Sequence, residues 1–202
     1  MTGGEHGRIK VQNDVKRFLL GIFDAEIVEQ LKQNYSATME EMCREQKARL
    51  SPTQYKNAKN SILVRVALYL SLKEHVGAEE ALVHTKAYFY GKVDIASKIM
   101  KFVSKSDLGF ALFRKAFSTG LKADTWTSKI TRNDRKVFTF DITKCLYKDL
   151  CDFYECPELC PMFCDGDWIM FRDMVKIKFE RSCTLGYGDE LCDFKFTRRL
   201  GS

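Results

Sequence analysis

Apolar residues recur at helical spacing through the first part of the chain. Between residues 11 and 34 they return about every 3.6 residues, which predicts an amphipathic helix over 11–34. A second helix is predicted over 78–103, and a shorter one follows Ser106. The shorter helix carries three phenylalanines on roughly one side: Phe110, Phe113 and Phe117.

The clearest helix start lies at Ser51. Ser51 can cap the first turn, Pro52 suits the first helical position, and Gln54 completes a capping box. The pattern predicts a helix that runs to about residue 76 and ends at Gly77, because glycine favours helix C-termini. Its middle is apolar nearly all round, so we expect it to be the central buried helix.

The second half of the chain changes to strand-like alternation. Three segments alternate between apolar and polar residues, which predicts strands over 136–142, 174–182 and 191–197. A short helix is predicted between the first two of these strands, over 143–154.

The last two predicted strands form a hairpin around Gly186 and Gly188. Each strand has an inward face: Val175, Ile177 and Phe179 in the first, and Cys192, Phe194 and Phe196 in the second. The predicted fold class is therefore α+β. We expect an N-terminal helical layer packed on a small antiparallel sheet that ends in a C-terminal hairpin.

The length of 202 residues fits a single domain over 1–202. Within it, a mainly helical half over 1–120 differs from a cysteine-rich half with strands over 135–200. The net charge of +6 is concentrated in the first part of the chain. Solvated lysine-rich helix faces are the ordinary cause of such a charge, so we do not expect nucleic acid as a partner.

No export or membrane signal is evident in the sequence. The first residues lack the apolar stretch of a signal peptide, and the most apolar run, over 61–73, is short and interrupted by Arg65. We therefore expect a cytoplasmic protein without a membrane partner. The expected ligand is a small molecule, and assembly into a homo-oligomer is left open. In that compartment cysteines are ordinarily free thiols, metal ligands or nucleophiles.

Seven of the eight cysteines lie between positions 145 and 192. One interpretation is a reduced core that holds them as small apolar residues. A second is a zinc site, because the predicted hairpin can bring Cys183 near Cys192. Cys164 and a carboxylate, from Glu180 or Asp167, would then complete four tetrahedral ligands.

A third interpretation makes one thiol a nucleophile, which requires a nearby base or a lowered pKa. No histidine lies in the cysteine-rich half, so a histidine partner would have to be His84 from the helical half. Asp165 and Asp167, on either side of a glycine next to Cys164, are candidate general bases toward water or a thiol. Otherwise these carboxylates form a solvated acidic turn or a helix N-terminus.

Several motifs in the last third of the chain resemble a known enzyme family. They are TKCLY at 143–147, PEL at 157–159, FCDGD at 163–167, ERSCTL at 180–185, Gly188, and CDFKF at 192–196. In order and spacing they resemble the L-2-amino-thiazoline-4-carboxylic acid hydrolase family. The closing motif is also similar to that of 4-vinyl-reductase-type small-molecule-binding domains, some of which bind zinc through such cysteines.

The hydrolase resemblance implies an enzyme that opens a cyclic C–N bond of a 2-aminothiazoline-carboxylate-like substrate by adding water. It implies four catalytic candidates: Cys164, Asp167, Thr184 and Cys192. Cys145 carries over as a candidate for substrate binding. Arg65 is a further candidate, for the substrate carboxylate, because a guanidinium inside an apolar helix needs an anion.

The second resemblance implies an alternative function. The protein would be a non-catalytic small-molecule-binding or sensor domain with a structural zinc held by Cys164, Cys183 and Cys192. Zinc is the candidate cofactor under this interpretation.

Overall fold

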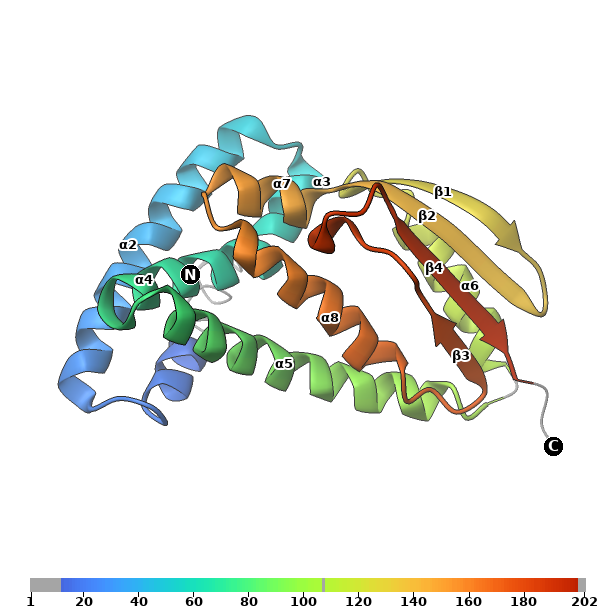
Figure 1. Cartoon of the computed structure of the whole chain (residues 1–202), viewed down its shortest axis with the longest axis horizontal. Helices are drawn as coiled ribbons and strands as arrows, with labels where there is room; N and C mark the ends of the chain where they lie inside the picture. The colour runs from blue at the N-terminus through green and yellow to red at the C-terminus, as the bar shows by residue number, and fades with distance from the viewer. Residues whose placement is uncertain (1–11, 107, 200–202) are drawn as a thin grey trace, which may run out of the picture. The chain divides into compact units, whose positions relative to one another are not determined.

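The computed structural model describes residues 12–106 and 108–199, and its contacts divide the chain into two compact units. The boundary falls after Tyr88, inside the long helix α5 (Ala78–Val103). The first unit is helical, whereas the second combines helices with a four-stranded antiparallel sheet (Figure 1). The predicted α+β class is therefore confirmed. A single domain over residues 1–202 stays a prediction.

The helices of the first unit follow the apolar pattern of the sequence. Residues 12–19 are helical, and four elements lie between them and α5: α2 (Ala25–Arg49), α3 (Pro52–Asn57), η1 (Ala58–Ile62) and α4 (Leu63–Val76).

The single helix predicted over 11–34 is wrong, because the chain turns at residues 20–24 and a new helix begins after Asp24. Glu26 in the first turn of α2 suits the positive end of that helix. Residue 11, where the prediction began, lies outside the described part of the chain.

The helix start at Ser51 is confirmed. Gln54 N donates to Ser51 Oγ at 3.1 Å, and Ser51 N donates to Gln54 Oε1 at 3.2 Å. The helix continues through the π-helical element η1 into α4 and ends at Gly77, whose φ of 83° favours glycine. Most of α4 between Leu63 and Leu72 is buried, as expected for the central helix.

The second unit leads from α5 through α6 to the sheet. Its elements are α6 (Gly109–Gly120), β1 (Trp126–Asn133), β2 (Val137–Cys145), α7 (Leu146–Phe153), η2 (Pro157–Leu159), α8 (Cys160–Phe171), β3 (Ile177–Glu180), η3 (Leu185–Tyr187) and β4 (Cys192–Arg198). The strands lie in the order β1-β2-β4-β3, and each neighbouring pair is antiparallel. The predicted C-terminal hairpin is therefore present as β3 and β4.

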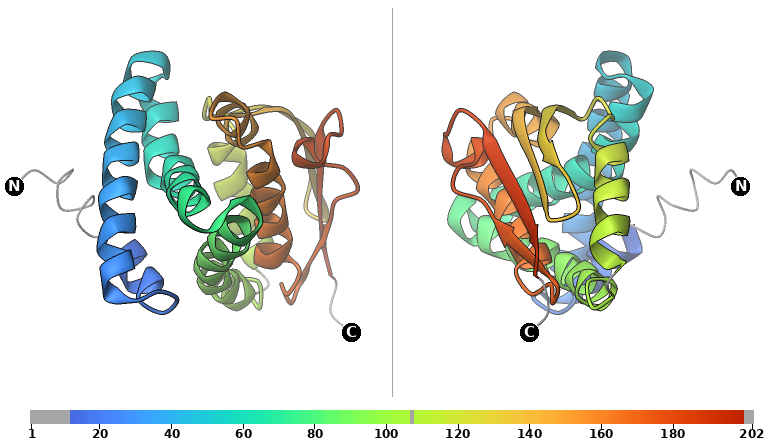
Figure 2. Two further views of the ribbon diagram at one scale, coloured as in Figure 1. Left: turned by 60° about the vertical axis from the view of Figure 1, so that its left-hand side comes forward. Right: turned by 90° about the vertical axis from the view of Figure 1, so that its right-hand side faces the viewer.

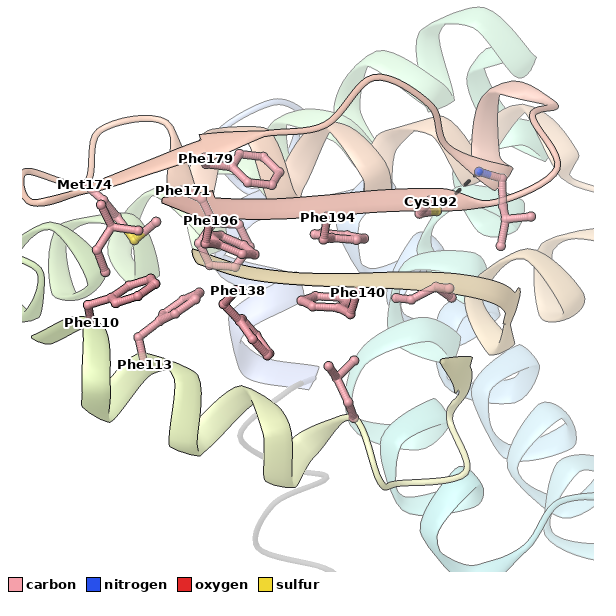
Figure 3. Packing of buried hydrophobic residues seen from close by; sticks show 14 residues of the cluster. Phe110, Phe113, Phe138, Phe140, Phe171, Met174, Phe179, Cys192, Phe194 and Phe196 are labelled. Atoms are coloured by element: carbon pink, nitrogen blue, oxygen red, sulfur yellow. Dashed lines mark hydrogen bonds between the residues drawn. The ribbon is translucent and has the colours of Figure 1, made fainter. Parts of the chain in front are cut away.

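The sheet buries one aromatic face. Phe138 lies opposite Phe196 and Phe140 opposite Phe194, so these rings stand on the same side of β2 and β4. Cys192 continues this face at the start of β4, where Figure 3 shows it at the end of the row of rings. The predicted inward face of the last strand is confirmed.

Helices α6 and α8 cover this aromatic face (Figure 2). The ring of Phe196 lies 4.6 Å from that of Phe113 on α6 and 5.3 Å from that of Phe171 on α8. Because one ring touches both helices, its burial fixes where α8 lies along the sheet.

Two strand predictions need correction. β3 is shorter than the predicted strand over 174–182, and Val175 is exposed before the strand begins. β1 was not predicted, because it is an edge strand with mostly exposed side chains and lacks the apolar alternation of a half-buried strand.

The segment around FCDGD is helical throughout. We expected Asp165 and Asp167 to flank a turn or a helix start, but α8 begins at Cys160 and continues to Phe171. Position 166 requires glycine because a Cβ there would lie 2.6 Å from the ring of Phe89 on α5. The glycine therefore allows close packing of α8 on α5 and does not end the helix.

None of the helices in the described part of the chain combines the length and the apolar character that a membrane span requires.

Candidate active site

Arg181 and Asp167 form an ion pair between the end of β3 and α8. Arg181 Nη1 donates to Asp167 Oδ2 at 2.9 Å, and Arg181 Nη2 donates to the Cys164 carbonyl at 2.8 Å. The Arg181 side chain is only 7% exposed, whereas that of Asp167 is 36% exposed. The guanidinium also lies 5.2 Å from the centre of the Phe194 ring. The arginine is therefore a fixed element of the site, and the carboxyl remains accessible.

Burial and the ion pair act in opposite directions on the proton affinity of Asp167. Desolvation raises the pKa of the Asp167 carboxyl to about 6, although the charge and the hydrogen bond of Arg181 both lower it. A carboxyl with a pKa near 6 can donate and accept a proton near neutral pH. Asp167 was predicted as a catalytic candidate, and its environment suits proton transfer.

A thiol cluster lies at the N-terminal end of α8. Cys160 is the first residue of the helix, and Cys164 follows one turn later. Hydrogen bonds from Cys151 and Cys164 lower the pKa of the Cys160 thiol, in spite of its burial. The same contact with Cys160 raises the pKa of Cys164, and burial adds to that effect. Contacts with Cys156 and Cys160 raise the pKa of Cys151.

The turn at η3 approaches these thiols closely. A Cβ on Gly186 would lie 2.6 Å from Cys164 Sγ and 3.3 Å from Cys160 Sγ. Any larger residue at position 186 would therefore have to displace a sulfur. The glycine, predicted only as a turn residue, is required here by the close approach of the backbone to the thiols.

Thr184 and Cys192 lie at the same turn. Thr184 is 9% exposed, and its Oγ1 makes no hydrogen bond of standard geometry within the described residues. The polar group it influences is the Cys164 thiol, whose pKa it lowers. Cys192 Sγ accepts a hydrogen bond from Leu185 N at 3.3 Å, drawn as a dashed line in Figure 3. Burial raises the pKa of Cys192, which favours a neutral thiol.

Two tyrosines hold Asp165. Tyr90 on α5 donates to Asp165 Oδ2 at 3.1 Å, and Tyr187 on η3 donates to Asp165 Oδ1 at 2.8 Å. Asp165, predicted as a general-base candidate, therefore connects α8 to both α5 and η3. Each of its two carboxylate oxygens accepts one hydrogen bond.

Cys183 belongs to a different set of contacts. Its Sγ donates to Asp193 Oδ1 at 3.2 Å, and Ser182 donates to the other oxygen of the same carboxylate. Asp193 follows Cys192 on β4, so their side chains point to opposite faces of the sheet. Hydrogen bonds from Ser182 and Cys183 outweigh burial and lower the pKa of Asp193 to about 2.

These contacts bear on the predicted zinc ligands Cys164, Cys183 and Cys192. Over residues 12–106 and 108–199, no group of three or more His, Cys, Asp or Glu side chains is arranged to hold a metal ion. Each of the three thiols has another partner, so the set does not fit a tetrahedral zinc site in this structure. Zinc binding stays a prediction.

Cys145 is the last residue of β2 and occupies the N-cap position of α7, without a side-chain capping hydrogen bond. Burial raises the pKa of the Cys145 thiol to about 12, although the backbone amides of Lys148 and Tyr147 lower it. The charges of Cys160 and Cys192 also act on it, which places Cys145 near the thiol cluster. Its role in substrate binding stays a prediction.

Arg65 and His84 lie in the first unit, whereas the other predicted site residues lie in the second. Arg65 Nη1 donates to the Ser61 carbonyl at 2.7 Å, within the π-helical element η1. His84 Nε2 lies 3.3 Å from Glu80 Oε1, one turn away on α5. The proposed roles of Arg65 toward the substrate and of His84 toward a thiol stay predictions.

The fold and the site define an α+β protein in which a guanidinium, an accessible carboxyl and several thiols lie close together. They lie where α8 meets the end of β3 and the start of β4. The family model of L-2-amino-thiazoline-4-carboxylic acid hydrolase matches residues 54–196. The chain therefore belongs to the L-2-amino-thiazoline-4-carboxylic acid hydrolase family, as its motifs predicted. Comparison with curated proteins and with solved structures gave no match.

Sequence reasoning missed Arg181 and Cys160 as site residues. Arg181 stands inside the ERSCTL motif and continues the inward alternation of Ile177 and Phe179, so strand parity could have placed it on the buried face. Cys160 could be found only by knowing that α8 begins there, because its neighbour Pro161 suggests a break in the chain.

Proposed function

We propose that the protein is a hydrolase that opens the ring of a 2-aminothiazoline-carboxylate-like cyclic amidine. Water adds at C2, the carbon bonded to two nitrogens and the ring sulfur. Membership of the hydrolase family supports this reaction class. The particular substrate and the roles of Asp167 and Arg181 belong to the same proposal.

The observation that carries the proposal is the Asp167–Arg181 pair beside Cys164. Ring opening at C2 requires a proton on the departing ring atom and removal of a proton from water. A carboxyl with a pKa near 6 suits both tasks. Asp167 would give its proton to the departing atom and take one from water afterwards.

Substrate binding needs a cation for the carboxylate. Arg181 has further N–H donors besides the two that contact Asp167 and Cys164, because a guanidinium carries five. When Asp167 is protonated, Arg181 keeps its charge and can attract the substrate carboxylate. Arg65 and Cys145 remain the candidates named from the sequence, with Arg181 now added.

The ring bond that breaks decides the product. Cleavage of the ring C–N bond, as expected from the sequence, leaves the carbamoyl group on sulfur and releases a primary amine. Cleavage of the C–S bond leaves the carbamoyl group on nitrogen and releases a thiol. Both reactions consume one water, so product analysis distinguishes them.

The test is incubation of the reduced protein with 2-amino-2-thiazoline-4-carboxylate. We expect loss of substrate with one equivalent of either amine or thiol, measured by mass spectrometry and by thiol titration. Cys43→Ser is the matched control, because Cys43 lies outside the thiol cluster on α2. If neither this substrate nor related cyclic amidines react, the proposed function is wrong.

A further inference from the structure

We infer that the exposed indole of Trp168 is a binding surface for a planar amidinium cation, the protonated form of a cyclic amidine. The inference rests on the proposed function for the class of ligand. It adds the ionic form in which the site receives that ligand and the side chain on which the ring lies.

The first argument is the position of Trp168 on α8. Trp168 follows Asp167 directly and lies one helical turn after Cys164, so it continues the face of α8 that carries Cys164. The η3 turn covers this face at Cys164, because a Cβ on Gly186 would lie 2.6 Å from the Cys164 sulfur. Trp168 therefore occupies the same face one turn beyond the point where η3 covers it.

The second argument is a contact that Trp168 shares with the Asp167–Arg181 ion pair. The indole packs against the ring of Phe179, with the ring centres 5.6 Å apart. The Arg181 guanidinium lies 5.9 Å from the centre of the same Phe179 ring and donates to Asp167. Trp168 and the ion pair thus adjoin the same buried side chain, and a ligand on the indole lies near both charges.

The third argument is the exposure of the aromatic side chains. Packing on Phe179 covers only part of the indole, which is 47% exposed. Tyr187 on η3 is also exposed, and its hydroxyl binds Asp165, three residues before Trp168 on α8. Single exposed aromatic residues are common on protein surfaces, so exposure alone does not define a site. The charges around these two rings supply the distinction.

The fourth argument is a surplus of negative charge. In the described part of the chain the donors to Asp165 are the phenols of Tyr90 and Tyr187, which are neutral at neutral pH and leave the carboxylate charge uncompensated. Asp167, by contrast, is paired with Arg181. When both carboxyls are ionised, these three charged groups together carry one surplus negative charge. An aromatic face beside surplus negative charge attracts a cation.

The proposed ligand matches these features in its own chemistry. A 2-aminothiazoline ring that gains a proton on its ring nitrogen is a planar cation whose charge is shared by two nitrogens, as in a guanidinium group. Such a cation presents a flat face to an indole and N–H donors to a carboxylate. The carboxylate on C4 of the proposed substrate would then approach Arg181, so that each charge of the ligand meets an opposite charge of the site.

The test compares two small ligands that lack the carboxylate. At neutral pH 2-amino-2-thiazoline is a cation, whereas 2-methyl-2-thiazoline is neutral. The chain has two tryptophans, so Trp126→Phe leaves Trp168 as the only indole that reports on binding by fluorescence. We expect the cation to quench the fluorescence of Trp168 in this variant and to bind with the wild-type Kd. The neutral ligand should quench it far less at the same concentration.

Substitution of Trp168 separates the aromatic face from simple apolar bulk. Trp168→Leu should bind the cation about 3- to 30-fold more weakly, because it keeps an apolar side chain and loses the aromatic face. Trp168→Phe keeps an aromatic face and should retain most of the affinity. Binding of the neutral ligand should change little in either variant. Calorimetry measures each Kd, and Trp126→Phe is the matched control, since Trp126 stacks on Tyr147 at the start of β1.

Circular dichroism and thermal unfolding show whether each variant is folded. Selective quenching by the cation, together with weaker binding in folded Trp168→Leu, supports the inference. Equal binding of the two ligands, or the wild-type Kd in folded Trp168→Leu, overturns it. If Trp168→Leu does not fold, the fluorescence of Trp126→Phe decides, and equal quenching of Trp168 by the two ligands overturns the inference.

Turnover separates this inference from the proposed function. If the wild type opens the ring, Trp168→Leu should raise KM with a smaller change in kcat, because the indole holds the substrate before it reacts. If no cyclic amidine is turned over but the cation binds through Trp168, the proposed reaction is wrong and the inference stands. If turnover proceeds and KM is unchanged in Trp168→Leu, the hydrolase function stands and the inference is wrong.

Discussion

Arg181 joins two points of α8 to the end of β3: its Nη1 lies 2.9 Å from Asp167 Oδ2, and its Nη2 lies 2.8 Å from the Cys164 carbonyl oxygen. The Asp167 carboxyl and the backbone of Cys164 are therefore positioned by the same side chain. Because the guanidinium is almost fully buried, this contact is less screened by solvent than a surface ion pair.

We expect Arg181→Met to lower the free energy of unfolding by about 1–3 kcal/mol, because Asp167 and the Cys164 carbonyl lose a donor. The double variant Arg181→Met with Asp167→Leu should recover part of this loss. Urea unfolding measures both. A single variant as stable as the wild type would show that the pair contributes nothing to folding.

Asp167 should make stability depend on pH. Its pKa in the folded protein is about 6, above the ordinary value of 3.8, because burial disfavours the charged form. A raised carboxyl pKa favours folding at low pH, and this contribution is lost as the pH rises through about 6. The unfolding free energy of the wild type, relative to Asp167→Asn, should therefore fall between about pH 4 and pH 6.

The control for this measurement is Asp173→Asn, an exposed carboxylate just after α8 that pairs with Arg172. Its stability difference from the wild type should stay nearly constant over the same range. A wild-type curve parallel to that of Asp167→Asn would contradict the raised pKa.

The same carboxyl should control the rate. If Asp167 acts as the acid in the first step, kcat/KM should fall as the pH rises through about 6, because only the protonated form delivers a proton. In Asp167→Asn, kcat/KM should no longer fall as the pH rises through about 6. Its value should be about 10²–10⁴-fold below that of the wild type. Asp173→Asn should keep the wild-type profile. A pH profile that is unchanged in Asp167→Asn would remove Asp167 from the reaction.

Gly186→Ala should disturb the packing of the η3 turn against Cys164 and Cys160. The added Cβ would lie 2.6 Å from Cys164 Sγ, so we expect a loss of about 1–3 kcal/mol of stability. Adding Cys164→Ala should restore much of the loss, since it removes the sulfur that clashes. Gly91→Ala on α5 is the matched control, because nothing lies within 4 Å of a Cβ there, and it should be neutral or slightly stabilising. Equal effects of the two glycine substitutions would contradict the close approach.

The aromatic face should depend most on Phe196. Its ring is fully buried and packs against Phe113 and Phe171, among others, so Phe196→Ala should cost about 3–5 kcal/mol. Phe153→Ala, at an exposed position on α7, should cost far less. Thermal unfolding compares the two. A small effect at Phe196 would mean that α8 is held to the sheet by other contacts.

Several parts of the fold could be predicted from short-range patterns. The capping residues Ser51 and Gln54, the stop at Gly77 and the alternation of Cys192, Phe194 and Phe196 depend only on neighbours in the sequence. The break at residues 20–24 and strand β1 were missed for the opposite reason. The apolar period continues across the break, and an exposed edge strand needs no apolar alternation.

The candidate site divides in the same way. The motifs identified Cys164, Asp167, Thr184 and Cys192 and the family of the chain, because residue types and spacing are properties of the sequence. Which sulfur contacts which could not be predicted, because Cys160 and Cys183 look equally suitable as partners until α8 and the loop after β3 are in place.

The sequence by itself determined the α+β class, the inward face of the last strand and the hydrolase family. Only the tertiary structure decided that Arg181 pairs with Asp167, that Cys183 joins Asp193 on the other side of the sheet, and that Gly186 faces two thiols. The physical reason is that burial and charge pairing arise between residues distant in the chain. Local propensity fixes where an element begins, but desolvation and the partner across the interface fix what its side chains can do.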